Sequence, residues 1–187
     1  MPYPAQTDLT TIVTTAQKLI EQEGVEQLSL ARLAAALGIR APSLYRHVAS
    51  KSALIRAVNQ LTLDELFATF AAATSTVLAT PQAQMIAILA SYRTFALAHP
   101  QTYILAFTTT NPEERPEAQA LEQKVLPFQA IMAQITGEAQ SLAALRGALA
   151  LVHGFVMLEL KGQLQREGDV EEAFAAAVQA YLQGWAK

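Results

Sequence analysis

Residues 29–51 read SLARLAAALGIRAPSLYRHVASK, and this stretch decides how the whole chain is interpreted. Ser29 is placed to cap a helix that Gly38 ends after about two turns. Pro42 suits the first turn of a second, very short helix that extends to about His47. Two short helices reversed at a glycine indicate a helix-turn-helix.

The apolar residues of the second short helix predict which of its side chains face outward. Leu44 and Val48 are spaced i, i+4 and are expected to pack against the preceding helix. That packing leaves Ser43, Tyr45, Arg46 and His47 largely outside the core. A major groove about 12 Å wide admits one such helix. The alternative is that Tyr45 and His47 pack against neighbouring helices and that Arg46 is ordinary solvated surface.

The charge of the chain is unevenly distributed. The sequence has 13 Lys and Arg against 16 Asp and Glu, a net charge of −3. The window 28–63 carries five basic residues and no acid, whereas the chain from Asp64 onward has seven basic against twelve acidic residues. A basic window in an acidic chain is typical of a small module that contacts phosphate. A solvated basic face is the alternative.

Donor geometry separates two roles within this motif. The Arg46 guanidinium can fork onto O6 and N7 of guanine and is expected to specify sequence. Ser43, Tyr45 and Lys51 can bond phosphate oxygens and are expected to position the protein.

Composition predicts an all-α fold. The 187 residues include 36 Ala and 25 Leu but only 10 Val and 9 Ile. Periodicity, caps and breaks predict about nine helices, at residues 8–23, 30–37, 42–47, 51 onward, 81–98, 100–109, 117–135, 139–166 and 169–185. Residues 1–60 are expected to form a helix-turn-helix domain, joined rigidly to a helical domain of residues 61–187.

About fifty residues, from Asp8 to Val58, resemble the N-terminal DNA-binding domain of TetR-type (tetracycline-repressor-like) transcriptional regulators. The matching residues are Gly24, Leu33-Ala34, Leu37-Gly38-Ile39, Pro42, Leu44-Tyr45, His47-Val48, Lys51 and Leu54. Three positions depart from the family pattern. Arg40 stands where Ser or Thr often caps the second short helix, Ala31 stands at a position that is often polar, and Ser52 replaces a common acidic residue.

The resemblance implies a homodimer that binds a palindromic operator in double-stranded DNA. It implies base contacts from residues 41–43 and Arg46, and phosphate contacts from Tyr45 and Lys51. The motif, the charge distribution and the resemblance together give the expected DNA-binding residues: Arg32, Arg40, Ala41, Pro42, Ser43, Tyr45, Arg46, His47 and Lys51.

The same resemblance makes the rest of the chain an effector-binding and dimerisation domain. The stretch 145–158 has Arg146 as its one charged residue, so a helix there must be buried on several sides. Gly147, Ala150 and Gly154 lie near one face and would let a second helix approach closely. With the last helix, this one resembles the pair that forms the four-helix dimer interface of the family. A buried helix in a monomer is the alternative.

His153-Gly154 resembles the His-Gly signature of one TetR C-terminal subgroup, although Val152 stands where that subgroup often has Trp. Met, Phe and Tyr side chains on the expected helices suit a small, mostly apolar effector. The candidate effector-binding residues are Met85, Leu89, Tyr92, Phe95, Tyr103, Phe107, His153 and Met157. Their alternative role is core packing, and His153 alone is more often a satisfied core residue.

Several function classes are excluded or disfavoured. The absence of Cys excludes a disulfide framework, a thiolate metal site and a cysteine nucleophile. No carboxylate pair, Ser/His/Asp set or phosphate-binding glycine loop is present, so we expect no enzyme, no cofactor and no metal. Residues 1–11 lack the basic start and apolar core of a secretory signal. Pro81 and Pro100 break the longest uncharged runs, so we expect neither run to span a membrane.

We therefore expect a cytoplasmic, ligand-responsive transcriptional regulator, most simply a repressor that its effector releases from DNA. The alternative is an all-helical small-molecule carrier or protein-interaction module with an inert helix-turn-helix.

Overall fold

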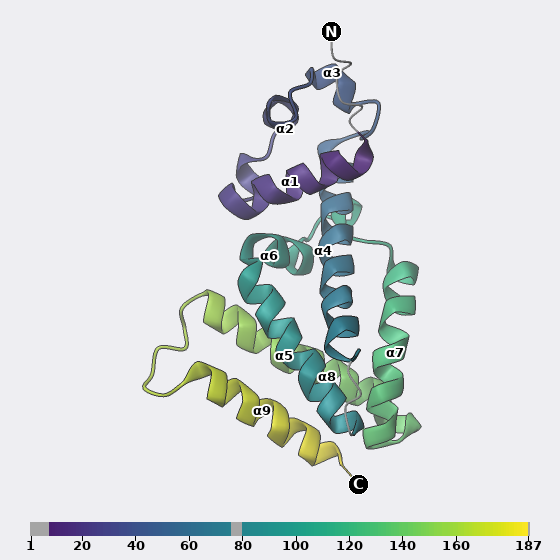
Figure 1. The fold of residues 1–187 in the computed structure, drawn as a ribbon, viewed down its shortest axis with the longest axis vertical. Helices are drawn as coiled ribbons and strands as arrows, with labels where there is room; N and C mark the ends of the chain where they lie inside the picture. Colours follow the sequence, from purple (N-terminus) through teal and green to yellow (C-terminus); the bar gives the residue numbers. More distant parts are fainter. Residues whose placement is uncertain (1–7, 76–79, 187) are drawn as a thin grey trace. The chain divides into compact units, whose positions relative to one another are not determined.

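A computed structural model describes residues 8–75 and 80–186 of the chain. Within these ranges the structure contains nine α-helices, two short 3-10 helices and no β-strand (Figure 1). The predicted all-α fold is confirmed. The chain divides into two compact units.

The first unit consists of the chain up to Glu65 together with His99–Glu117. It contains α1 (Leu9–Glu23), η1 (Val25–Gln27), α2 (Leu30–Ala36), α3 (Ala41–Leu44), α4 (Lys51–Ala73) as far as Glu65, α6 (Pro100–Thr108) and η2 (Pro112–Glu114). The expected division at residue 60 assigns His99–Glu117 to the second domain, whereas packing places this segment in the first unit.

Short-range capping explains where the helices of the first unit begin. The Asp8 carboxylate accepts a hydrogen bond from the Thr11 amide at 2.7 Å, and the Ser29 hydroxyl accepts one from the Arg32 amide at 3.1 Å. The Ser50 hydroxyl accepts one from the Ala53 amide at 3.0 Å. Each bond satisfies an amide that has no partner within its own helix. These starts agree with the predicted helices to within one residue.

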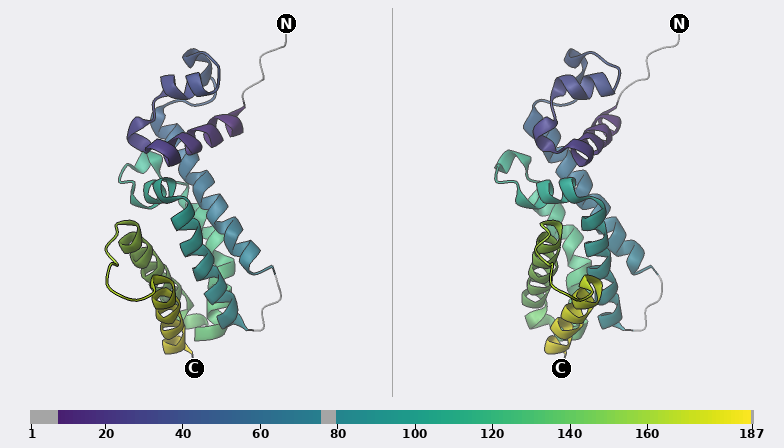
Figure 2. Two further views of the ribbon diagram at one scale, coloured as in Figure 1. Left: turned by 60° about the vertical axis from the view of Figure 1, so that its left-hand side comes forward. Right: turned by 90° about the vertical axis from the view of Figure 1, so that its left-hand side faces the viewer.

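The second unit consists of residues 66–98 and 118–187. It contains the end of α4, α5 (Pro81–Ala98), α7 (Ala118–Thr136), α8 (Glu138–Leu160) and α9 (Val170–Trp185). Helix α5 packs against α7, α8 and α9, and Figure 2 shows α8 and α9 side by side in both views. Pro127 lies inside α7 without ending that helix.

Helix α8 ends at Leu160, six residues before the predicted end at Arg166, so that prediction was wrong. Gly162 has φ of +63°, a conformation that glycine adopts at little cost. Its amide donates to the Glu159 carbonyl, and the Gln163 amide donates to the Leu158 carbonyl, both at 2.9 Å. These two bonds form a Schellman motif, which closes the C-terminus of a helix.

Gly147 admits a helix of its own chain. A Cβ atom at Gly147 would collide with the Tyr181 hydroxyl and lie 3.0 Å from the Cζ atom of that ring. The Tyr181 hydroxyl donates a hydrogen bond to the Ala144 carbonyl at 2.7 Å. The glycine therefore makes room for α9, rather than for a helix of a second subunit. Gly154, by contrast, has open space where its Cβ would lie.

Helix α8 is apolar but incompletely covered. Leu142, Leu149 and Leu158 are exposed, and the helix is long and apolar enough to cross a membrane by length and composition. His153 is half-buried on this helix, and burial lowers the pKa of its imidazole below the ordinary value of 6.5.

We predict that Gly147→Ala lowers the free energy of unfolding by about 1–3 kcal/mol, because the added methyl group displaces Tyr181. An alanine in a helix is otherwise favoured over glycine by about 0.5–1 kcal/mol. Chemical denaturation of Gly147→Ala, Tyr181→Phe and the double variant measures the effect. In the Tyr181→Phe background the cost of Gly147→Ala should fall, and an unchanged cost would contradict the assigned clash.

We also predict that stability declines in mildly acidic solution because of His153. Its folded-state pKa lies below 6.5, so folding favours the neutral imidazole. The His153 contribution is fully present above that value and is lost as the pH falls through 6.5 toward the folded-state pKa. The midpoint of thermal unfolding should therefore drop less between about pH 7.5 and pH 5.5 in His153→Gln than in the wild type. Equal drops in the two proteins would contradict the assignment.

Candidate nucleic-acid interface

The short helix α3 is anchored by two buried side chains. Leu44 is fully buried and Val48 is 5% exposed, and both belong to the apolar core of the first unit. The other core residues come from α1, α2, α4 and the chain between α1 and α2: Ile12, Val13, Ala16, Ile20, Leu28, Leu33, Ala34, Leu54, Ile55 and Val58. The predicted anchoring role of Leu44 and Val48 is confirmed.

The regular part of α3 is shorter than predicted. The helix begins at Ala41 and ends at Leu44, and residues 45–47 form a turn rather than α-helix. The amides of His47 and Val48 both donate to the Leu44 carbonyl, at 2.9 and 3.0 Å. Arg40 holds the N-cap position and makes no side-chain capping bond, since a guanidinium has no acceptor. A helix without a side-chain cap is less stable, which agrees with the short length of α3.

The side chains that follow Leu44 point away from the core. Tyr45 is 60% exposed, and Arg46 and His47 are also exposed. An exposed tyrosine, arginine and histidine on one turn supply aromatic surface and cationic donors together. The expected DNA-binding residues all lie in this region of the first unit: Arg32, Arg40, Pro42, Tyr45, Arg46, His47 and Lys51 are exposed, and Ala41 and Ser43 are half-buried.

Two of the basic side chains in the 28–63 window are bound within the first unit. Arg32 pairs with the Glu23 carboxylate of α1. The Nε atom of Arg56 donates to the Glu113 carbonyl at 2.6 Å. A phosphate contact by Arg32 would therefore compete with Glu23. The sequence does not reveal either pair. Glu23 and Arg32 lie on either side of η1, and Arg56 and Glu113 are 57 residues apart.

The expected effector-binding residues fall into two groups. Met85, Leu89, Tyr92 and Phe95 are buried in the second unit, where His153 and Met157 are half-buried on α8. Tyr103 and Phe107 belong to the first unit, where their rings are 4.7 Å apart.

Sequence reasoning missed an aromatic cluster around Tyr92 in the second unit. The rings of Phe70 and Tyr92 stack with centroids 5.8 Å apart, and Phe128 meets Phe70 edge-on at 5.3 Å. Phe67 stacks on Phe128 at 5.7 Å. The cluster thus joins the end of α4 to α5 and α7. The i, i+3 spacing of Phe67 and Phe70 was the signal available in the sequence.

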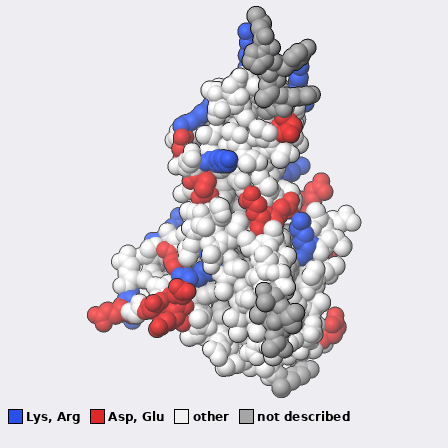
Figure 3. Space-filling model, viewed as in Figure 1, with Lys and Arg blue, Asp and Glu red and all other residues white. Residues whose placement is uncertain are grey.

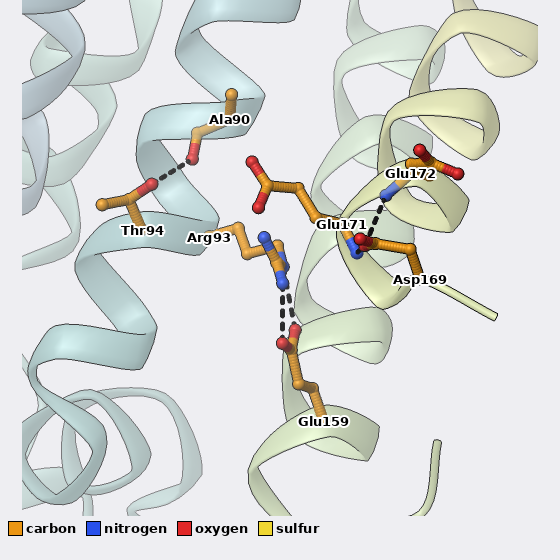
Figure 4. Close-up of polar contacts among 7 residues, drawn as sticks. All are labelled: Ala90, Arg93, Thr94, Glu159, Asp169, Glu171 and Glu172. Atoms are coloured by element: carbon orange, nitrogen blue, oxygen red, sulfur yellow. Dashed lines mark hydrogen bonds and ion pairs between the residues drawn. The ribbon is translucent and has the colours of Figure 1, made fainter. Parts of the chain in front are cut away.

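A second missed feature is a half-buried ion pair between α5 and α8. Arg93 Nε and Nη2 donate to the two Glu159 carboxylate oxygens at 2.8 and 2.7 Å (Figure 4). This bond raises the pKa of the Arg93 guanidinium above its ordinary value. Arg93 also lies over the Phe174 ring, 5.4 Å from its centroid. The side chain therefore ties α5 to both α8 and α9.

The surface of the second unit carries features of other kinds. On the face drawn in Figure 3, acidic side chains gather where the chain leads into α9, which begins after Asp169 and has Glu171 and Glu172 in its first turn. A surface hollow of about 330 Å³ is lined by Leu126, Gln129, Ala130, Ala133, Gln134 and Glu138. No group of three or more metal-ligating side chains occurs among residues 8–75 and 80–186.

Two family descriptions match this chain. Residues 12–58 match the bacterial regulatory proteins of the tetR family, and residues 85–181 match the tetracyclin repressor-like C-terminal domain. Among curated proteins, the chain is 28% identical to YobS, an uncharacterised HTH-type transcriptional regulator of Bacillus subtilis (strain 168), over 92% of this chain and 90% of that protein. It is 33% identical to an HTH-type transcriptional regulator of Saccharopolyspora erythraea, over 90% of this chain and 68% of that protein.

Solved structures share the fold. A protein of unknown function from Rhodococcus sp. RHA1 superposes with a TM-score of 0.81 at 24% identity, over the whole of both chains. BioQ with its double-stranded DNA operator gives a TM-score of 0.68 at 24% identity, over 97% of this chain and 99% of that one. A TetR variant from Acinetobacter baumannii AYE, in complex with minocycline, gives 0.71 at 21% identity, over 96% of each chain. With both family matches in place, the chain belongs to the TetR family and is a DNA-binding transcriptional regulator of the helix-turn-helix type.

Proposed function

We propose that this regulator is a homodimeric repressor that holds a palindromic operator through α3 and leaves it when a small, mostly apolar effector binds. The observation that carries the proposal is the outward presentation of Tyr45, Arg46 and His47 by the buried Leu44 and Val48. A DNA-bound regulator of this kind acts in the cytoplasm, and no catalytic step is part of the proposal.

Each exposed group of the α3 region has a distinct role in this proposal. Arg46 forks onto a guanine edge in the major groove and supplies base preference. Tyr45, Ser43 and Lys51 donate to phosphates and set the register of α3 on the duplex. Arg32, Arg40 and His47 add cationic or polar contacts at the rim, with Ala41 and Pro42 against the bases. The exposure of Arg32, Arg40, Pro42, Tyr45, Arg46, His47 and Lys51 supports this assignment, while Ala41 and Ser43 are half-buried.

The uncovered face of α8 supports a dimer. Leu142 and Leu149, spaced i, i+7 on one side of α8, are 42% and 46% exposed, and α9 exposes the small residues Ala173, Ala176 and Ala180. Small side chains allow close helix approach, and a second copy of the same pair would bury the leucines. Dimerisation also supplies the two reading helices that a palindromic site requires.

The effector is proposed to bind in the second unit, near the buried residues of α5 and the half-buried His153 and Met157. The Tyr92 ring and its phenylalanine neighbours offer the apolar surface for this, whereas Tyr103 and Phe107 belong to the first unit and are left out of the proposed site. The minocycline complex of the structurally similar TetR variant supports a small-molecule site in this fold. An effector changes operator affinity only by its differential affinity for two conformations.

Operator binding is tested by titrating the protein with duplexes, first an operator obtained by in vitro selection and then a scrambled sequence. We predict salt-dependent binding that prefers the operator. Arg46→Ala should lower that preference by about 5- to 100-fold, since one bidentate base contact is lost. Lys51→Ala and Tyr45→Phe should weaken binding to both duplexes, and Lys51→Ala should lower the salt slope by about one.

Equal losses on the two duplexes for Arg46→Ala would show that its role is misassigned. Absence of any salt-dependent, sequence-selective binding by the wild type would favour a small-molecule carrier or protein-interaction module with an inert helix-turn-helix.

The dimer is tested by Leu149→Glu, which places a charge on the exposed apolar face of α8. We predict a shift toward monomer in sedimentation velocity and a loss of operator affinity, because a buried unpaired carboxylate is costly. Leu126→Glu on α7 is the matched control, since Leu126 is 48% exposed and lies outside the proposed interface. The proposed interface would be refuted by a Leu149→Glu protein that remains dimeric, or by equal dissociation in the control.

A further inference from the structure

The N-terminus of helix α6 is capped by the carboxylate of Glu21, which belongs to α1. One Glu21 oxygen accepts a hydrogen bond from the Gln101 amide at 3.0 Å. The other accepts from the Thr102 amide at 3.1 Å and from the Thr102 hydroxyl at 2.6 Å. His99, the N-cap residue of α6, makes no side-chain capping bond. A residue 80 positions earlier in the sequence therefore caps this helix, and its negative charge suits the helix N-terminus.

The loop that follows α6 is tied to one face of α4. Arg56 donates to the Glu113 carbonyl at 2.6 Å, and the Asn59 side-chain amide donates to the Glu114 carbonyl at 2.9 Å. The Ser52 hydroxyl donates to a Glu114 carboxylate oxygen at 3.4 Å. Ser52, Arg56 and Asn59 are spaced i, i+4 and i+7, so they share one face of the helix.

The segment between these two attachments is packed into the first unit. Thr102 and Tyr103 are 1% and 0% exposed, and Leu105 packs against the apolar core that contains Leu44 and Val48. The Glu114 carboxylate also accepts from the Thr109 hydroxyl at 3.0 Å and from the Asn111 amide at 3.1 Å, so the loop is stiffened internally.

Asn59 is a buried polar side chain that is only partly paired. The side chain is fully buried, and its Oδ1 atom has no hydrogen-bond partner among residues 8–75 and 80–186. An unsatisfied buried acceptor is destabilising, and an apolar residue of similar shape removes that penalty. The Asn59 side-chain amide donates to the Glu114 carbonyl of the loop and so links α4 to that loop. This favours a positioning role for Asn59 over a stabilising one.

We propose that His99–Glu117 is a bracket that fixes α1 and α4 against each other and so sets the position of α3 for operator reading. Glu21 and Asn59 are positioning residues of this bracket. The inference rests on the proposed operator binding by α3.

The size of α3 explains why a bracket matters. Four helical residues are too few to hold a helix in place by their own hydrogen bonds. The position of α3 therefore depends on the burial of Leu44 and Val48 in the apolar core. The apolar core that contains Leu44 and Val48 also contains Ile12, Ala16 and Ile20 of α1 and Leu54 and Val58 of α4. A change in the spacing of α1 and α4 therefore moves α3 without altering any residue that contacts DNA.

The test compares Glu21→Ala and Asn59→Leu with Glu26→Ala, a control that removes an exposed acid near the end of α1. Duplex titrations are run well below the unfolding midpoint of every variant, with folding checked by circular dichroism. We expect operator affinity to fall about tenfold in the two bracket variants, as when a base contact is misplaced. Affinity for a scrambled duplex should stay within about twofold, and the control should match the wild type.

Asn59→Leu separates positioning from stability. Its unfolding midpoint should stay close to that of the wild type while its operator affinity falls, because leucine removes the unpaired Oδ1 acceptor but also leaves the half-buried Glu114 carbonyl without its donor. A merely structural role predicts that stability and affinity fall together. Glu21→Gln keeps an acceptor and should restore part of the affinity lost in Glu21→Ala. Unchanged operator affinity in the folded variants, or equal losses on operator and scrambled duplexes, would overturn the proposal.

A measurement without DNA distinguishes failure of the bracket from failure of operator binding. The His47 and Val48 amides, which bond to the Leu44 carbonyl, should exchange hydrogen faster in Glu21→Ala and Asn59→Leu than in Glu26→Ala. Unchanged exchange would refute the bracket even if the wild type binds its operator. A wild-type protein without operator preference would refute the proposed function by itself, whatever the exchange rates show.

Discussion

The burial of Leu44 and Val48 is the contact on which the DNA-reading surface depends. These two side chains fill the core formed by α1, α2 and α4, and their burial forces Tyr45, Arg46 and His47 into solvent. Helix α3 has no side-chain cap and only four helical residues, so this apolar contact, rather than the helix's own hydrogen bonds, determines where it lies. A weak local structure is thus made specific by tertiary packing.

The apolar core that buries Leu44 and Val48 contains residues from several elements. The first unit is therefore formed by segments that lie far apart in the sequence. The chain passes between the two units at three places, inside α4, before α6 and after η2. The segment between the second and third crossings is bonded to α1 at one end and to α4 at the other. In the proposed bracket, operator reading therefore depends on residues that lie outside the helix-turn-helix motif.

Local chemistry made much of the fold predictable. Ser29, Ser50 and Asp169 cap helices through amides two or three residues away, so their roles are visible in the sequence. The bonds of Glu21 to Thr102 and of Arg93 to Glu159 join residues 81 and 66 positions apart, and no periodicity reveals them. Gly147 was visible as a site of close approach, but its partner, Tyr181, was not. The outward face of α3 was predictable because i, i+4 burial leaves the intervening side chains exposed.

Methylation interference on a selected operator tests the central claim most directly, because guanine N7 lies in the major groove and adenine N3 in the minor groove. The account predicts that methylation of guanine N7 blocks binding in two symmetric half-sites, centred about one helical turn or a multiple of it apart. Binding that tolerates methylation throughout the major groove, and is blocked only from the minor groove, would contradict it.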